Sequence, residues 1–241
     1  HHQSEVKLPN AFSIVNPNRL DDKSNLQYLC AAGVSFMFLV SLNRELRNNN
    51  WFSENKIKEP NLINFLDLVS LGTVCDVVPL IGLNRAIVKQ GLKILKLKKN
   101  LGLKTLLDIC KIDTNPSTYH LGYLIGPRIN AGGRVGKCSH GANLLLNKDP
   151  KYSFKLASEL DQFNKERQLL EKDLLIKILN ETKDKSNEPV LVLSGKNKSF
   201  IFDFFEGIKL ILSNSIIKFS IVLSGLTSFV GRGVLETLPL I

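Results

Sequence analysis

The sequence FLDLVSLGTVCDVVPL, Phe65 to Leu80, is the stretch on which the interpretation of the whole chain depends. It is an almost uninterrupted apolar run bounded on its far side by Pro79 and Gly82, a pattern typical of a buried strand or helix that leads into a tight loop. Asp76 lies within it. Moving an unpaired carboxylate out of water is costly, so such an acid usually has a cation, a metal or backbone N–H groups beside it. Two interpretations stay open: Asp76 caps the next turn, or it is a metal ligand.

The composition indicates a globular protein. The chain has 241 residues, 44% of them hydrophobic, enough for one large or two modest domains. Its apolar stretches, such as Val34 to Leu42, are too short to span a bilayer and no signal peptide opens the sequence, so we expect a cytoplasmic protein without a membrane segment. The first residue is histidine rather than methionine, from which we expect that the natural N-terminus is missing. The four cysteines form no CxxC pair, which argues against a zinc site or a disulfide framework.

The charge favours an anionic partner. A formal net charge of +10 is typical of proteins that bind nucleic acid. The alternative is a composition rich in Lys and Asn that keeps the surface solvated without binding anything.

The first half of the chain alternates apolar segments with polar connections. His1 and His2 open it, as a tag remnant or as part of the protein, and lead to a strand-like segment at Ala11–Val15. Residues 26–46 are apolar on nearly every side, which predicts a buried core helix. An amphipathic helix that Asn84 can cap is expected up to about residue 98, and a shorter one over residues 103–110.

The segment HLGYLIGPRINAGGRVG, His120 to Gly136, is a candidate phosphate-binding loop. Its glycines would let backbone N–H groups approach an anion, and Arg128 and Arg134 offer planar forks that suit phosphate oxygens. Asn130 adds an amide between them. An ordinary surface loop with solvated arginines is the alternative.

The last third of the chain predicts a long helix and then a second domain. Leucines, Phe163 and Ile178 recur at helical spacing over residues 151–182, and a helix of about thirty residues extends about 45 Å, longer than a compact domain needs. It is expected to join two bodies. After residues 183–188, strand-like segments at Val190 and Phe219 flank a Phe-rich middle, a βαβ pattern in a small or incomplete domain.

Together these segments resemble the RecJ family of single-stranded-DNA-specific exonucleases, members of the DHH phosphoesterase superfamily. The resemblance covers about three quarters of the chain, and the co-occurrence in order is more specific than any one motif. The segments that carry it are Leu8–Asp22, CAAGV at Cys30, DLVSLGTVCDVVPL at Asp67, GPRINAGGR at Gly126 and ELDQFNKER at Glu159.

The resemblance implies a fold and a set of site residues. It implies an α/β protein: the remnant of a parallel-sheet DHH domain over residues 1–149, a connector helix and linker over residues 150–186, and a partial DHHA1-like domain over residues 187–241. His1 and His2 look like the histidines of the Asp-His-His signature and Asp76 like a later metal-binding aspartate, so Mn²⁺ or Mg²⁺ is the expected cofactor. Arg128, Asn130 and Arg134 match the family segment that contacts the DNA backbone.

The chain also departs from the family pattern. The aspartate of the signature and the earlier aspartate-rich motifs are absent, and three candidate ligands do not hold two metals. The family's Trp-His-Pro-Gly segment is replaced by KSFIF at Lys198, and its phosphate loop by GVLET at Gly233, which places Glu236 where an arginine is expected. An acid there would repel DNA. A glycine- and histidine-containing C-terminal motif is missing as well.

The expected function is therefore metal-dependent hydrolysis of single-stranded DNA from the 5′ end, in DNA recombination and repair. We expect a monomer and leave open whether it has repair-protein partners. The 241-residue chain alone is expected to be inactive or nearly so and poorly soluble, because apolar helix faces would lie exposed. Two alternatives remain. One is a related phosphoesterase that acts on short oligonucleotides or cyclic dinucleotides, and the other is a non-catalytic remnant that binds nucleic acid or a partner protein, or has no function.

Overall fold

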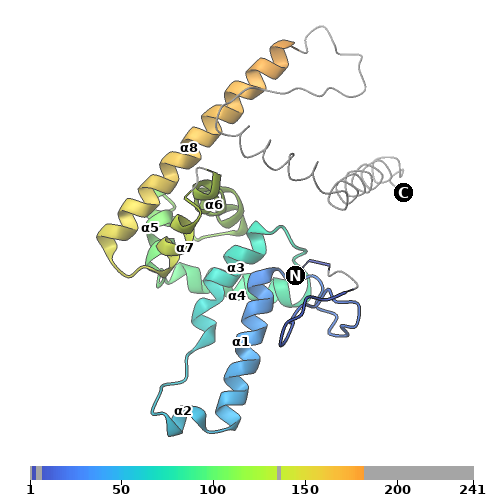
Figure 1. Ribbon diagram of the computed structural model, residues 1–241. Helices are drawn as coiled ribbons and strands as arrows, with labels where there is room; N and C mark the ends of the chain where they lie inside the picture. The colour runs from blue at the N-terminus through green and yellow to red at the C-terminus, as the bar shows by residue number, and fades with distance from the viewer. Residues whose placement is uncertain (1, 4–6, 135–136, 182–241) are drawn as a thin grey trace, which may run out of the picture. The chain divides into compact units, whose positions relative to one another are not determined.

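The computed structural model describes residues 2–3, 7–134 and 137–181, and these residues form helices and connections without a strand. The chain divides into two compact units, His1–Glu171 and Lys172–Ile241. Figure 1 shows the course of the chain. The elements are α1 (Ala31–Asn48), α2 (Trp51–Glu54), η1 (Leu62–Phe65), α3 (Leu66–Cys75), α4 (Gly82–Lys96), α5 (Leu101–Ile109), η2 (His120–Ile125), α6 (Gly126–Arg134), α7 (Ser139–Leu146) and α8 (Pro150–Glu181).

The apolar stretch quoted first forms α3, so of the two structures that it allowed, strand or helix, it takes the helix. Buried side chains lie on nearly all sides of α3, which explains why its sequence lacks a polar face. The helix ends where Val77 takes a left-handed conformation, with φ of 55°, and Pro79 follows.

α3 and α4 pack so closely that a side chain is excluded at Gly91 of α4. A Cβ atom built there would lie 1.7 Å from Ser70 Oγ and 2.2 Å from the Leu66 carbonyl oxygen, both of α3. The same contact is fixed by the Ser70 hydroxyl, which donates to the Ile87 carbonyl over 3.1 Å. Glycine therefore sets the distance between the two central helices.

The main hydrophobic core lies among α3, α4, α5, η2, α7 and α8. Leucines dominate it, which fits the helical spacing that predicted α4, α5 and α8. α8 contributes Leu156 and Leu160 from its first half, and these anchor the long helix to the first unit. Other buried members include Leu95, Leu103, Leu106, Leu121 and Leu144.

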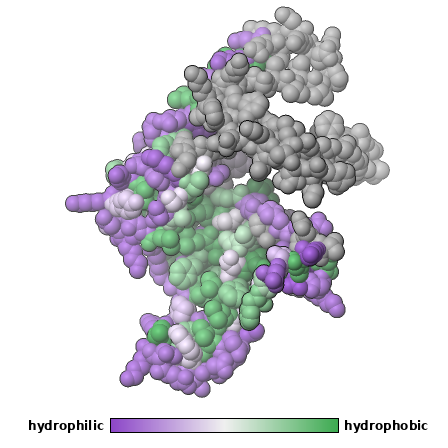
Figure 2. Space-filling model, in the orientation of Figure 1, coloured by the Kyte–Doolittle hydropathy of each residue, from purple (hydrophilic) through white to green (hydrophobic). Residues whose placement is uncertain are grey.

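α1 differs from its prediction. The sequence predicts a buried helix over this region, but only Gly33 and Asn43 are buried on α1. Its large apolar side chains Phe38, Leu39 and Leu42 lie exposed, and hydrophobic residues gather along the course of α1 in Figure 2. The prediction was wrong because an apolar sequence indicates that a helix favours burial but does not show which other residues, if they are present, pack against it.

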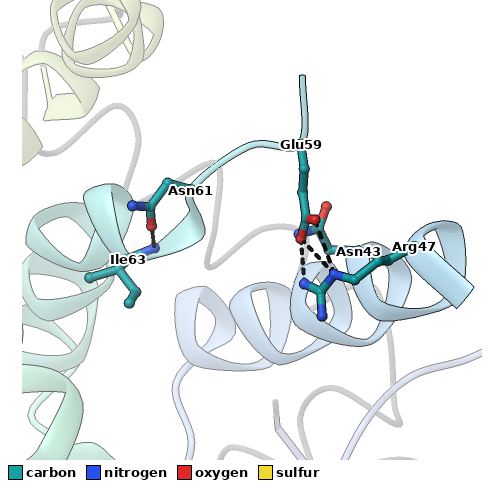
Figure 3. A network of polar contacts seen from close by, with 5 residues as sticks. All are labelled: Asn43, Arg47, Glu59, Asn61 and Ile63. Carbon is teal, nitrogen blue, oxygen red and sulfur yellow. Dashed lines mark hydrogen bonds and ion pairs between the residues drawn. The ribbon is translucent and has the colours of Figure 1, made fainter. Parts of the chain in front are cut away.

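Polar contacts fix both ends of α1. At its start Cys30 Sγ accepts a hydrogen bond from the Gly33 amide and lies 3.5 Å from Thr73 Oγ1 of α3. Near its end Asn43 and Arg47 point together at the Glu59 carboxylate (Figure 3), with Asn43 Nδ2 donating over 2.7 Å and Arg47 Nε over 3.0 Å. The hydrogen bond from Arg47 lowers the pKa of Glu59. This network ties the connection between α2 and η1 back to α1.

The expected sheet is not observed in the described residues. Ala11–Val15, which is strand-like in sequence, belongs to neither a helix nor a strand. The strands predicted at Val190 and Phe219, and the domain boundary at residues 186–187, lie outside the described residues and stay predictions. The long helix is confirmed as α8, and among the described helices none is both long and apolar enough to cross a membrane.

Candidate functional site

A cavity of about 940 Å³ lies between the start of α1, α3, the helix formed by η2 and α6, α7, and α8. Its wall is made largely of small and apolar residues, including Gly72, Gly122 and Gly126. Three polar side chains line it from three different helix ends or faces, and these are Asp76, Asn130 and Arg167. A carboxylate, an amide and a guanidinium therefore share one concave surface.

Asp76 is the C-terminal cap of α3 and is exposed, so it is not the buried acid that its apolar neighbourhood predicts. Its backbone N–H donates to the Gly72 carbonyl over 3.0 Å. The C-terminus of a helix carries a partial negative charge, so a carboxylate there is disfavoured by the helix and attracts a cation. Next to Asp76, the backbone of Val77 is in the left-handed region, which is strained for a residue with a β-branched side chain.

Cys75 lines the cavity next to Asp76. Desolvation and, second, the negative charge of Asp76 raise the pKa of its thiol to about 11. The thiol donates to the Leu121 carbonyl oxygen over 3.6 Å, and a Cβ atom at Gly126 would lie 2.4 Å from Cys75 Sγ. Gly126 thus allows α6 to meet the end of α3, and both residues of this contact line the cavity.

The glycine-rich segment is a helix and not the predicted loop. η2 is a π-helical turn, and α6 continues it directly. Backbone N–H groups inside α6 serve the helix, so they do not form the phosphate cradle that the glycines suggested. At Gly132 a Cβ atom would lie 2.8 Å from the Lys137 carbonyl and 3.1 Å from the Leu160 side chain, which explains the small residue.

Arg128 and Asn130, both predicted to contact DNA, point in different directions. Asn130 is exposed and lines the cavity. Arg128 turns towards α8, where Nε donates to Asp161 Oδ1 over 2.8 Å and Nη1 donates to the Leu124 carbonyl over 2.8 Å. The two side chains of this ion pair are only 15% and 12% exposed. Phosphate binding by Arg128 therefore stays a prediction, and its observed contacts join α6 to α8.

Asp161 receives a second cation. Lys165 Nζ lies 2.8 Å from Asp161 Oδ2. Desolvation alone would raise the pKa of the Asp161 carboxyl, but the hydrogen bonds from Lys165 and Arg128 outweigh it and hold this pKa below its ordinary value. The acid is thus kept ionised as the partner of Arg128.

The remaining predicted site residues are described only in part. His1 lies outside the described residues, and His2 is exposed with its carbonyl oxygen accepting from Asn16 Nδ2 over 2.8 Å. Arg134 is the last residue of α6, and its side chain lies outside what is described. Within the described residues no three His, Cys, Asp or Glu side chains form a group that could hold a metal ion. The set His1, His2 and Asp76 accordingly stays a prediction.

Two residues with notable environments in the structure were not among the site residues predicted from the sequence. Asp67, in the first turn of α3, is the buried carboxylate of this helix at 2% exposure, and desolvation raises its pKa. Arg167 of α8 lines the cavity, and its guanidinium contacts Asn164 Oδ1 at 3.2 Å and pairs with Glu171. The available signal was spacing, since Arg167 follows Leu160 by seven residues and continues the core-facing stripe of the helix.

The fold is similar to that of solved RecJ structures, and no family model matches the chain. Two crystal structures of RecJ from Thermus thermophilus are similar to it. The Mn²⁺ complex has a TM-score of 0.56 at 30% identity, covering 70% of this chain and 24% of that one. The Mg²⁺ complex has a TM-score of 0.51 at 32% identity, covering 61% and 22%.

Curated relatives give the same result at the level of sequence. Single-stranded-DNA-specific exonuclease RecJ of Salmonella typhimurium is 40% identical over 192 residues, 78% of this chain and 33% of that protein. The Escherichia coli protein of the same name is 39% identical over 181 residues, 74% and 31%. The chain belongs to the RecJ family, and it spans about a third of the length of these relatives.

Proposed function

We propose that this chain carries part of the site of a RecJ-type nuclease that hydrolyses single-stranded DNA from its 5′ end, in recombination and repair. The observation that supports this most is the cavity that Asp76, Asn130 and Arg167 line together. A phosphodiester needs a cationic or amide donor for its oxygens and an acid or metal site for the attacking water. Those two requirements match the three polar side chains.

We propose Asp76 as a ligand of Mn²⁺ or Mg²⁺, together with His1 and His2. The carboxylate fits such an ion because it stands at the negative end of α3, and hard divalent cations prefer oxygen ligands. When bound, divalent ions of this kind activate a water and stabilise the leaving oxygen of a phosphodiester. Three ligands are too few for two ions, so we propose that further carboxylates complete the site.

We propose that Arg167 and Asn130 hold the phosphate within the cavity. Arg167 is pre-oriented by Asn164 and Glu171, so its guanidinium loses little freedom when it contacts an anion. Asn130 adds an amide donor from α6. Arg134 remains a proposed backbone contact. Arg128 would have to open an ion pair whose two side chains are only 15% and 12% exposed, whereas the Glu171 partner of Arg167 is 55% exposed, so we place Arg128 behind the other two.

The test is digestion of a 5′-labelled single-stranded oligonucleotide with and without Mn²⁺. The chain alone and the chain extended by an upstream aspartate-rich segment are compared, each with the native Asp76 and as Asp76→Asn. We expect hydrolysis in the extended form and little in the chain alone. Losing a metal ligand should lower the rate at least about a hundredfold. The exposed Asp108, which pairs with Lys98 outside the cavity, provides the control Asp108→Asn, which should leave the rate unchanged.

Undiminished hydrolysis by Asp76→Asn would refute the metal role of Asp76. A preference for very short oligonucleotides or cyclic dinucleotides would indicate a different phosphoesterase. Salt-sensitive DNA binding without hydrolysis in either form would indicate a binding remnant. Strand polarity follows from comparing 5′-labelled and 3′-labelled substrates. A monomeric state and a cytoplasmic location stay predictions alongside these.

A further inference from the structure

Two tyrosines form a stacked pair on the surface of the helix that lines the cavity. The rings of Tyr119 and Tyr123 have centroids 5.2 Å apart and an interplanar angle of 26°. Their exposed fractions are 58% and 71%, so neither ring serves the core. A stacked aromatic pair that is left in solvent presents a flat apolar face of ring size.

Neighbouring groups hold this pair in place. Tyr119 meets the ring of His120 edge-on, with centroids 5.9 Å apart. His120 is itself fixed, because its Nδ1 accepts from the Ser117 amide over 2.9 Å and lies 3.0 Å from Ser117 Oγ. A ring whose orientation is restricted in advance loses less conformational entropy when a ligand packs on it.

The pair lies on the same continuous helix as residues that line the cavity, although neither tyrosine lines it itself. Gly122, which lines the cavity, directly precedes Tyr123 in η2. Asn130 lines the same cavity seven residues further on, about 10 Å along the helix axis. That length corresponds to about three nucleotides at the spacing of a stacked strand.

We propose that Tyr119 and Tyr123 form a stacking platform for the bases of single-stranded DNA whose phosphates enter the cavity. Exposed aromatic rings next to a phosphate site are the arrangement that binds unpaired bases, because every base offers a π-face and no base edge needs to be read. The net charge of +10 supports an anionic occupant such as nucleic acid. The proposal rests on the proposed function in one respect, that single-stranded DNA is the ligand.

Binding is measured by fluorescence anisotropy with a labelled oligothymidine, using the full chain in EDTA so that no cleavage occurs. We expect Tyr119→Ala and Tyr123→Ala each to weaken binding at least about fivefold. Tyr123→Phe keeps the ring and should bind like the native chain. Tyr152→Ala removes another exposed tyrosine, which lies on α8 outside the stacked pair, and should also have no effect. Because Tyr119 and Tyr123 are exposed, circular dichroism should show native helicity in every variant.

A strand of the same length with abasic sugars separates stacking from phosphate contacts. The native chain should bind this strand more weakly, and Tyr123→Ala should bind it as the native chain does, because no bases remain to stack. The salt dependence of binding should be the same for the native chain and Tyr123→Ala, since stacking releases no counterions. If Tyr123→Ala weakened binding to the abasic strand and to oligothymidine by the same factor, the platform would be refuted. Unchanged binding of both alanine variants to oligothymidine, or no binding by the native chain, would refute it as well.

The two proposals fail separately. The stacking platform is tested by measuring DNA binding without metal, and the nuclease function is tested by measuring metal-dependent hydrolysis by the extended chain. Hydrolysis with normal binding by both alanine variants would refute only the platform. Base-dependent binding that needs both tyrosines, without hydrolysis in any form, would refute only the nuclease function.

Discussion

The two aspartates of α3 show how one helix treats negative charge at its two ends. Asp67 lies in the first turn, where the helix favours an anion by about 0.3–1 kcal/mol, and yet its pKa is raised because burial outweighs that gain. Asp76 lies at the other end, where the helix disfavours an anion but water reaches it. The apolar sequence suggested burial for Asp76, because sequence spacing does not show where a helix ends and solvent begins.

We expect Asp67→Asn to stabilise the fold at pH 7. An acid whose pKa is raised in the folded state binds its proton more tightly there, so stability grows as pH falls from the raised pKa towards about 3.9 and is reduced above it. The amide keeps an acceptor for the Leu68 N–H, which donates to Asp67 Oδ1 over 2.8 Å. A gain of about 1 kcal/mol would raise the melting temperature by about 2–4 °C at pH 7.

Thermal unfolding between pH 4 and pH 8 measures this effect, and the advantage of Asp67→Asn should shrink towards pH 4. The surface variant Asp108→Asn should change little over the same range, because its pairing with Lys98 is exposed. A less stable Asp67→Asn at pH 7 would mean that the ionised carboxylate makes a net favourable contact.

At the level of elements, the contacts between helices depend on positions without a side chain. Apolar spacing was sufficient to predict α4, α5 and α8, since leucines at helical intervals bury one face. It was not sufficient for α6, because a segment with Gly126, Gly132 and Gly133 has low helix propensity. Only in the folded chain do contacts with Cys75 and Leu160 explain why glycine stands at the first two of these positions.

We expect Gly91→Ala to lower the free energy of unfolding by about 1–3 kcal/mol. The new Cβ atom would meet Ser70 Oγ and the Leu66 backbone, and the backbone contact cannot be relieved by a rotamer change. Gly133→Ala is the matched substitution, since nothing lies within 4 Å of its Cβ position. Alanine should stabilise that helix by up to about 1 kcal/mol.

Urea denaturation followed by circular dichroism compares the two glycine variants directly. Opposite signs would support packing as the reason for glycine at position 91. If both variants were stabilised by similar amounts, α3 and α4 would have room to separate, and close packing would not explain Gly91.

At the level of the whole molecule, the exposed apolar residues of α1 and the net charge of +10 act in opposite directions. Charge repulsion keeps copies apart, while Phe38, Leu39 and Leu42 offer apolar area that water disfavours. The exposed apolar residues that would cause poor solubility therefore include a group on α1 of the described surface. The sequence predicted apolar helix faces in general, and the structure identifies α1 as one of them.

We expect Leu39→Lys together with Leu42→Lys to reduce self-association. Lysine has nearly the helix propensity of leucine, so α1 should persist while its apolar surface shrinks. Light scattering across a concentration series measures the effect. Ser35→Lys adds charge at an exposed position of α1 without removing apolar area and should help less. If Ser35→Lys reduces self-association as much per added charge as the double variant does, charge repulsion rather than the apolar surface of α1 controls association.

Because of the π-helical turn at His120–Ile125, the face on which each residue of α6 lies depends on the number of residues that precede it in the helix. A π turn holds about one residue more than the α-helical turns around it. Removing a single residue within this turn would return it to a regular α-helical turn and leave the residues beyond it on their present faces, whereas a deletion between Gly126 and Asn130 would rotate Asn130 by about 100°. Only the second deletion would carry Asn130 out of the cavity while the helix stayed intact, so the effect of a one-codon deletion depends on whether it falls inside the π turn or beyond it.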